Sequence, residues 1–134
     1  MAKCAKAKEL IVTTEDKAGM LAEITSVISE QGVNISALCA YGMEGKAVFM
    51  ILTSDIKKAR SAVEAKGWKA DEKDVVVLDL PDNVGAAKKI SDRLKAKNVN
   101  LKYCYGTTCV CSADCASRLV LASDDNDAIL AALK

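Results

Sequence analysis

The stretch TTEDKAGMLAEI, residues 13–24, returns in altered form as DLPDNVGAAKKI, residues 79–90. The two stretches align at an offset of 66 residues, which pairs Asp16 with Asp82 and Gly19 with Gly85. The same offset pairs Val33-Asn34 with Val99-Asn100. These identities fall where elements of structure are expected to begin and end, so we infer that the chain contains two homologous units.

Each unit starts with the same order of elements. A short apolar run rich in β-branched residues, 10–13 in the first copy and 75–80 in the second, predicts a buried strand. An Asp and a Gly then lead into a helical pattern of apolar residues. The helices are expected to end at Gly32 and Asn98, because these two residue types readily adopt the left-handed conformation of a helix C-terminus. A second strand follows.

The last elements distinguish the two copies. In the second copy, a strand at residues 119–121 and a helix that starts at Ser123 or Asp124 complete the pattern, so no last strand is expected there. The first copy continues with a turn at residues 41–45, a strand at 47–52, a helix capped by Ser54 or Asp55 and closed near Gly67, and a last strand from Trp68.

The order of elements predicts an α+β protein. Residues 8–73 read as βαββαβ and residues 74–134 as βαββα, with residues 1–7 as a flexible tail. We therefore expect two ferredoxin-like units, each an antiparallel sheet with helices on one face. In such a sheet the last strand flanks the first, so residues 75–80 would keep an unpaired apolar edge. We expect a second copy of the chain to cover that edge.

Composition restricts the function. The chain of 134 residues is 51% apolar, and its 19 basic and 18 acidic residues give a net charge of +1. Such a balance provides no field to attract nucleic acid or an anionic membrane. No apolar run has the length of a signal peptide core or a membrane span, so we expect a cytosolic protein with reduced thiols. The sequence has no histidine, the commonest general base, and no recognisable catalytic group, so we expect no enzyme activity.

The repeated pattern of strand, D-x-x-G, helix and G-[IV]-N-[IL] resembles the ACT domain, a small ferredoxin-like module that senses amino acids. The resemblance covers residues 8–134 and is greatest to stand-alone tandem ACT proteins. In two positions the family usually has proline, whereas this chain has Ala18 and Val84. The residues that carry the resemblance are DKAGMLAEI with GVNISAL in the first half, and DNVGAAKKI with NVNLKYCY in the second.

An amino acid needs hydrogen-bond donors for its carboxylate, acceptors for its ammonium group and an apolar wall. The first turn of a helix supplies unpaired N–H groups, and the asparagine at the start of the second strand supplies both donors and an acceptor. The resemblance implies that the loop of one domain faces the second strand of another across an interface. The candidate ligand-binding residues are Asp16, Lys17, Ala18, Gly19, Met20, Leu21, Asn34, Ile35, Asp82, Asn83, Val84, Gly85, Ala86, Asn100 and Leu101.

Each candidate also has a purely structural interpretation. Asp16 and Asp82 could cap their helices, and the two loop glycines could permit tight packing of strand against helix. Asn34 and Asn100 could simply close the turn after the helix. In the second copy, we expect at most one of Tyr103 and Tyr105 to face a ligand.

The stretch CYGTTCVCSADC, residues 104–115, holds four of the six cysteines. Four thiolates can bind zinc or an iron–sulfur cluster, but the spacing of Cys104, Cys109, Cys111 and Cys115 matches no standard pattern of either site. Alignment of the copies makes this stretch an enlarged turn of the second unit. We therefore assign no cofactor, and keep a metal-binding or thiol-redox module as the alternative function.

The resemblance implies a non-catalytic regulatory sensor with an amino acid as its ligand. We expect it to act as a homodimer or through an enzyme of amino-acid metabolism. A third hypothesis is an interaction domain whose ligand sites have decayed. The missing prolines and the missing last strand suggest this hypothesis.

Overall fold

The computed structural model describes residues 3–107 and 116–134. The chain divides into two compact units. One contains residues 8–73, and the other contains residues 74–134 together with the beginning of the chain up to Ala7. Both β1 (Lys3–Glu15) and β4 (Lys69–Pro81) are long strands that contribute residues to each unit.

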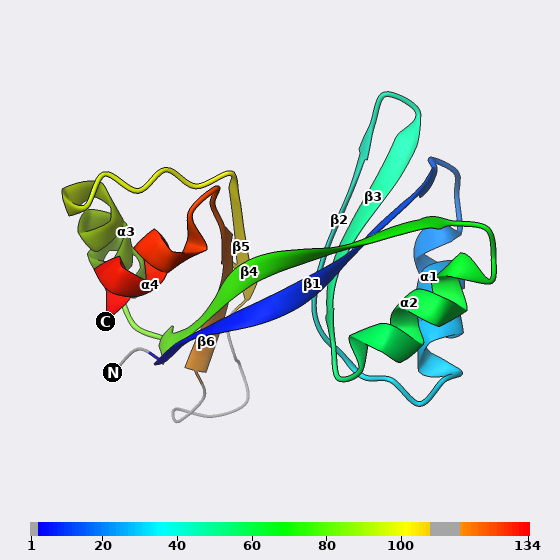
Figure 1. Cartoon of the computed structure of the whole chain (residues 1–134), viewed down its shortest axis with the longest axis horizontal. Helices are drawn as coiled ribbons and strands as arrows, with labels where there is room; N and C mark the ends of the chain where they lie inside the picture. The colour runs from blue at the N-terminus through cyan, green and yellow to red at the C-terminus, as the bar shows by residue number, and fades with distance from the viewer. Residues whose placement is uncertain (1–2, 108–115) are drawn as a thin grey trace. The chain divides into compact units, whose positions relative to one another are not determined.

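In the unit of residues 8–73, the strands follow the order β2-β3-β1-β4, and α1 and α2 cover one face (Figure 1). Leu10 pairs with Ile51 and Val12 with Phe49 in the antiparallel β1–β3 ladder, and all four side chains are buried against the helices. Helix α1 buries residues at helical spacing, from Met20 to Ile28. The remaining elements are α1 (Met20–Ser29), β2 (Ile35–Met43), β3 (Lys46–Thr53) and α2 (Ile56–Glu64).

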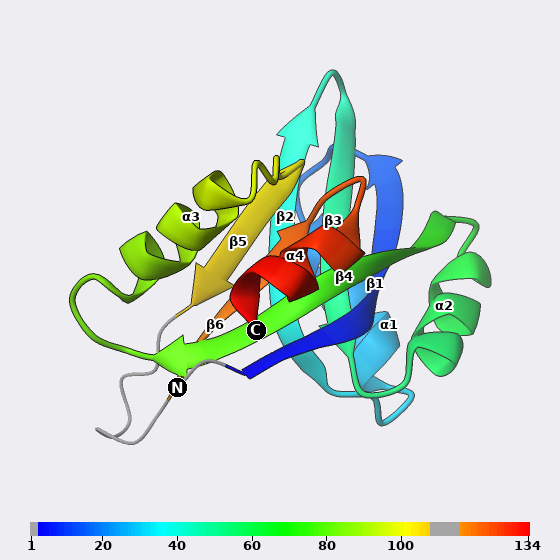
Figure 2. The same cartoon turned by 60° about the vertical axis from the view of Figure 1, so that its left-hand side comes forward.

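The other unit repeats this arrangement, with strand order β1-β4-β6-β5 and with α3 and α4 on one face of the sheet (Figure 2). Leu78 and Leu80 of β4 pack with Ile90 and Leu94 of α3 in a second apolar core. Its remaining elements are α3 (Ala86–Ala96), β5 (Tyr103–Thr107), β6 (Ala116–Ala122) and α4 (Asn126–Leu133). The predicted α+β fold with antiparallel sheets and four helices is therefore confirmed.

The edge of the second unit differs from expectation. Residues 3–7, expected as a flexible tail, form the beginning of β1 and lie beside β4 as the edge strand of this unit. Cys4 packs against the apolar core, and Lys6 Nζ lies 2.6 Å from Asp127 Oδ1 on α4. The expectation that a second chain covers residues 75–80 is therefore wrong, because the chain supplies the last strand from its own beginning.

Helix caps separate the four helices into two pairs. Asp55 caps α2 and Asp125 caps α4, each accepting a hydrogen bond of 3.1 Å from a backbone N–H in the first turn. Helices α1 and α3 start instead after Gly19 and Gly85, with no side-chain cap. The alternative that Asp16 and Asp82 cap these helices is therefore wrong.

The residues expected to turn left-handed after the helices do so. Gly32 has φ 72° and Asn98 has φ 55°. Within the described residues, none of the helices combines the length and the apolar character required to cross a membrane.

Candidate functional site

The loop before α1 is fixed to the hairpin between β2 and β3. The backbone N–H of Asp16 donates to the carbonyl of Gly45 over 3.1 Å. The Asp16 carboxylate lies over Gly42, since a Cβ added there would come within 2.6 Å of Asp16 Oδ2. Gly42 is thus a position where a side chain would displace Asp16. Lys17 lies beside acids of the same segment, with its Nζ 3.3 Å from Glu15 Oε1.

Gly19 and Gly85 have φ angles of 90° and 87°, in the left-handed region that other residues rarely adopt. A Cβ built on either glycine would meet no heavy atom within 4 Å. Tight packing of strand against helix is therefore not the reason for these glycines. Their backbone conformation is the reason, and the space beside them is open.

The residues around each loop glycine differ in exposure. Ala18 is exposed, Met20 is buried in the core, and Leu21 is half exposed. In the second unit Val84 is fully exposed. Met20 thus has a structural role, whereas Leu21 and Val84 present apolar side chains to the surroundings.

The predicted asparagines lie at the start of the second strand of each unit. The Asn34 backbone N–H donates to Ser54 Oγ, and its carbonyl accepts from the Ser54 N–H, both over 2.9 Å. These bonds tie the turn before Ile35 to the end of β3, while the Asn34 side chain is exposed. In the second unit Asn100 and Leu101 line a cavity of about 400 Å³ at the end of α3.

Within one unit, the predicted residues form two groups that do not meet. The loop residues lie at the start of the helix, and the asparagine lies beyond its end. An 11-residue helix such as α3 is about 16 Å long at 1.5 Å per residue. A ligand that touches both groups must therefore bridge two domains, as the resemblance implies.

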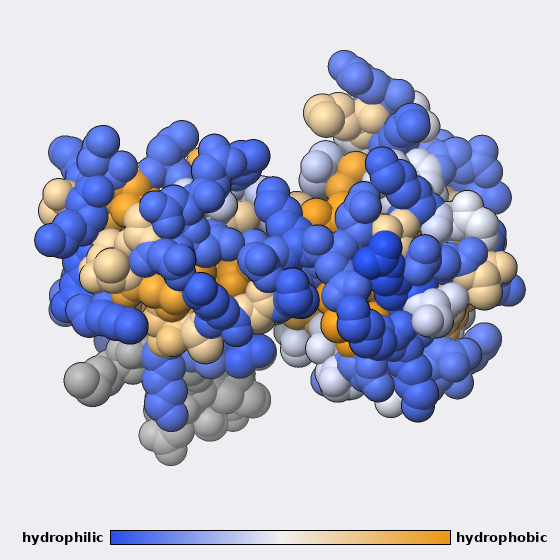
Figure 3. Space-filling view, in the orientation of Figure 1, coloured by the Kyte–Doolittle hydropathy of each residue, from blue (hydrophilic) through white to orange (hydrophobic). Residues whose placement is uncertain are grey.

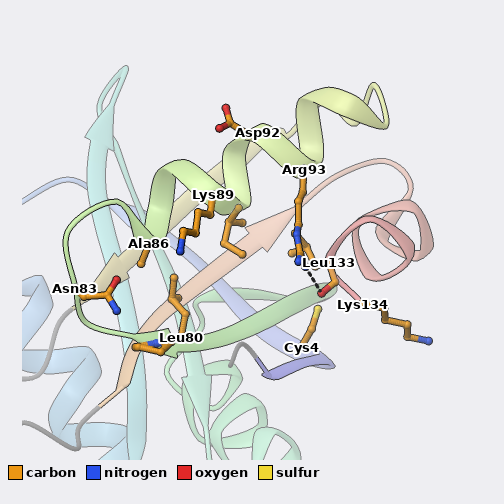
Figure 4. A pocket seen from close by; sticks show the side chains of 11 residues that line it. Cys4, Leu80, Asn83, Ala86, Lys89, Asp92, Arg93, Leu133 and Lys134 are labelled. Carbon is orange, nitrogen blue, oxygen red and sulfur yellow. Dashed lines mark hydrogen bonds between the residues drawn. The ribbon is translucent and has the colours of Figure 1, made fainter.

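Two cavities of the second unit adjoin the loop before α3. The smaller, about 340 Å³, is lined by Asp82, Asn83 and Ala86 together with residues of β4, β5 and β6. The larger, about 680 Å³, also includes Asn83 and Ala86 (Figure 4). Its other polar residues, including Lys89 and Arg93, were not among the predicted residues.

The sequence contains a signal for these two cations. Ala86, Lys89, Ile90 and Arg93 follow the spacing i, i+3, i+4, i+7 that places residues on one side of a helix. Ile90 is buried, whereas Lys89 and Arg93 are exposed, so the spacing places both cations on the same side of α3 as a core residue, at the rim of the apolar face.

The cysteines and tyrosines are described only in part. Burial raises the pKa of the Cys104 thiol, and burial also raises the pKa of the Cys4 thiol although Lys134 opposes it. In both cases burial disfavours the thiolate, which is the reactive form of cysteine. Cys109, Cys111 and Cys115 lie outside the described residues, so the metal hypothesis stays a prediction.

That at most one of Tyr103 and Tyr105 faces a ligand stays a prediction, while the structure shows how their rings lie. The rings of Tyr103 and Tyr105 stack with their centroids 6.4 Å apart. Residues i and i+2 of a strand lie on the same face, so the two rings adjoin one another rather than pointing apart.

Comparison with known proteins finds a sequence match in the first unit and similar folds over the whole chain. Residues 8–66 match the family model of the ACT domain. A comparison with curated protein sequences found no match. The crystal structure of protein BT0572 from Bacteroides thetaiotaomicron is similar over 97% of this chain and 88% of that chain, with 27% sequence identity and a TM-score of 0.86.

Two regulatory subunits of aspartate kinase have the same fold. The subunit from Thermus thermophilus, in a ligand-free form, shares 13% identity with a TM-score of 0.64. The subunit from Thermus flavus shares 15% identity with a TM-score of 0.64. Each comparison covers 98% of this chain and 93% of the other. Residues 8–66 are therefore similar in sequence to the ACT domain, and the two-unit fold is that of these regulatory subunits.

Proposed function

We propose that this protein is a non-catalytic regulatory sensor that binds an amino acid through the loops before α1 and α3. The observation that carries the proposal is the difference among the four helices. Asp55 and Asp125 cap α2 and α4, whereas α1 and α3 start at left-handed glycines with no side-chain cap. The N–H groups of Met20 and Ala86 donate to the carbonyls of Lys17 and Asn83, and the next N–H groups of each first turn remain to receive a carboxylate. The ACT domain match supports the regulatory role.

The other half of each site is proposed to come from a second domain. The exposed Asn34, or Asn100 in the other repeat, offers an amide oxygen to an ammonium group and N–H donors to a carboxylate. Such a site couples ligand binding to the pairing of domains, because a ligand that touches both stabilises their association.

We further propose that the protein forms a homodimer and acts on an enzyme of amino-acid metabolism in the cytosol. The edge that first suggested a dimer is occupied by residues 3–7. Support comes instead from β2, which is an edge strand and exposes Leu38, Tyr41 and Met43. Two related folds are described as regulatory subunits of aspartate kinase, which supports an enzyme partner. Mass measurement in solution tests the dimer, and a monomer at every concentration would contradict it.

A thermal-shift screen of the twenty amino acids tests the ligand. We expect one chemical group of amino acids to raise the melting temperature of the protein. The rise should disappear in the double variant Gly19→Val, Gly85→Val and weaken in Asn34→Ala.

The matched control is Gly67→Val. Gly67 also has a positive φ of 82° and open space for a Cβ, but it follows α2 and lies in neither loop. Its substitution should lower the melting temperature without removing the ligand-induced rise. A flat profile with all twenty amino acids would contradict the proposal.

A further inference from the structure

The cavity of about 680 Å³ lies between α3, the end of β4, the end of α4 and the first residues of β1 (Figure 4). Its apolar part consists of Leu80, Ile90 and Leu133, which are only 4%, 6% and 4% exposed, with Cys4 beside them. In the space-filling view, apolar residues reach the surface over α3 and α4 among hydrophilic ones (Figure 3). The volume falls in the range of small-molecule sites, about 300–1,000 Å³.

Two cations face this cavity from α3. Lys89 and Arg93 lie one helical turn apart, and both are directed from the helix toward the cavity (Figure 4). Arg93 Nη1 donates to the carbonyl of Leu133 over 3.4 Å, which leaves most of its N–H donors available. Lys134 also lines the cavity, but its side chain is directed away from it (Figure 4).

The acid of this lining is already engaged. Asp92 Oδ2 accepts from Lys88 Nζ over 2.6 Å, and the Asp92 carboxylate lies on the side of α3 away from the cavity (Figure 4). The lining therefore presents positive charge beside apolar side chains, and among the described residues its acid is not directed to receive an ammonium group.

The other repeat does not share this chemistry. The corresponding face of α1 has Glu23 and Val27 at the positions of Lys89 and Arg93. The groove there is about 300 Å³, and its lining holds two acids, Glu23 and Glu30, against one cation, Lys66. The positive cavity is thus a property of the second unit, not a general consequence of the fold.

We propose that this cavity binds an aliphatic monocarboxylate that carries no amino group. Arg93 and Lys89 would bind the carboxylate through charge-assisted hydrogen bonds, and the alkyl chain would pack on Leu80, Ile90 and Leu133. The cavity shares Asn83 and Ala86 with the loop before α3, but the groups proposed to bind the carboxylate, Lys89 and Arg93, lie outside that loop, so variants of Lys89 can distinguish the two sites.

Such a ligand also touches the strand that completes the unit. Cys4 belongs to residues 3–7 of β1, and it lines the cavity opposite α3. A ligand that contacts both should stabilise the attached form of this edge segment by mass action. We therefore expect hydrogen exchange of the backbone amides of residues 4–7 to slow when the cavity is filled.

The test is calorimetric titration of the full-length protein with octanoate, octanamide and leucine. Octanoate should bind, and octanamide should bind at least about tenfold more weakly because it lacks the charge. Lys89→Gln should weaken octanoate binding by about tenfold. Lys88→Gln is the matched control, since it removes the same charge from the adjacent residue that pairs with Asp92 outside the cavity.

The outcomes separate this site from the loops. Leucine binding at the loops should be lost in the double variant Gly19→Val, Gly85→Val and unchanged in Lys89→Gln, whereas octanoate binding should persist in the double variant and weaken in Lys89→Gln. The proposal is overturned if octanoate does not bind, if octanamide binds equally well, or if Lys88→Gln and Lys89→Gln weaken octanoate binding to the same extent. Slower exchange of residues 4–7, with no change in α1, would support it.

Discussion

At the scale of single residues, the loop glycines test how backbone conformation determines the site. Gly19→Ala should lower the free energy of unfolding by about 1–2 kcal/mol, the usual cost of a left-handed alanine. The cost is conformational, because a Cβ at Gly19 meets no neighbour. Gly19→Asn should cost less, since asparagine tolerates this conformation. Urea unfolding measures both, and equal losses for Ala and Asn would contradict the conformational explanation.

A charged pair in the second unit predicts how stability depends on pH. Arg118 Nε and Nη2 donate to the two carboxylate oxygens of Asp79 over 2.8 and 3.0 Å, across the β4–β6 ladder. Hydrogen bonds from Arg118 hold the pKa of Asp79 below its usual value. This stabilisation is therefore present above the unfolded-state pKa of about 3.9 and is lost as pH falls through the lower folded-state pKa.

The variant Asp79→Asn should be less stable than the natural protein by about 1 kcal/mol at pH 7, because the pair is bidentate but about one-third exposed. Below about pH 4 the difference should shrink, because Asp79 becomes protonated in the natural protein. Urea unfolding from pH 7 to pH 2.5 measures this difference. A constant difference across the range would show that the charge of Asp79 is not what stabilises the fold.

At the scale of elements, each unit has a short edge segment, residues 69–73 of β4 in one and residues 3–7 of β1 in the other. The residues through which these segments pair with the neighbouring helices have opposite charges. In residues 8–73, Glu72 on β4 accepts from Arg60 Nη1 over 2.9 Å and from Lys57 Nζ over 3.1 Å, both on α2. In the other unit, Lys6 on β1 pairs instead with Asp127 on α4. Exchange of the two segments would place like charges together, so the reversed signs favour the observed attachment of each segment to its own unit.

Deletion of residues 1–7 should destabilise one unit selectively. Without its edge strand, β4 exposes unpaired backbone N–H and C=O groups and apolar side chains, so amides of Leu78 and Ile90 should exchange faster. Amides of Ile24 in the other core should keep their protection. Lys6→Ala is the control, because its ion pair is well exposed and should contribute little. Equal loss of protection in both cores would contradict a local role for this segment.

The sequence predicted the repeated elements but not the origin of this strand. Periodicity and turn residues located the helices and most strands of the described part of the chain from residue 8 onward, including the left-handed turn at Asn98. Asp55, one of the two residues predicted, caps α2, whereas α4 is capped by Asp125 and does not start at Ser123 or Asp124. The strands expected from Trp68 and at residues 75–80 are one continuous strand, β4. The segment KCAKA has neither alternating hydrophobicity nor β-branched residues, so it shows no strand signal of its own. Its strand conformation comes from pairing beside β4, which is a long-range contact that local pattern does not encode.

The candidate site was also predicted only in part. Gly19 and Gly85 were identified because a left-handed backbone conformation strongly favours glycine, so the residue type itself marks the position. Lys89 was missed because Lys88 and Lys89 are chemically identical neighbours, and only the packing of α3 shows which one faces the cavity. Which of the two lysines can bind a ligand depends on the side of α3 from which it projects, and that side is defined only by the tertiary structure.

At the scale of the whole molecule, the unit of residues 8–73 is an insertion within the other unit. The second unit consists of the first residues of the chain and residues 74–134, so its first and last strands come from opposite ends of the sequence. Folding of this unit therefore requires a contact of high sequence separation, which is slow to form. By contrast, residues 8–73 hold all of their own strands, and their pairings span shorter separations, such as that of Leu10 with Ile51.

A rearranged chain tests this organisation. Lys134 and Cys4 line the same cavity, so the two segments end close together. A linker of about eight Gly and Ser residues, with a typical reach of about 15 Å, should join residue 134 to residue 1. The chain of residues 74–134, linker and residues 1–7 then has the complete βαββαβ order. We expect it to unfold cooperatively by circular dichroism, whereas residues 74–134 alone should unfold at a lower temperature or remain unfolded. Equal stability of the two chains would show that residues 3–7 add nothing to the unit, and the insertion model of this protein would then fail.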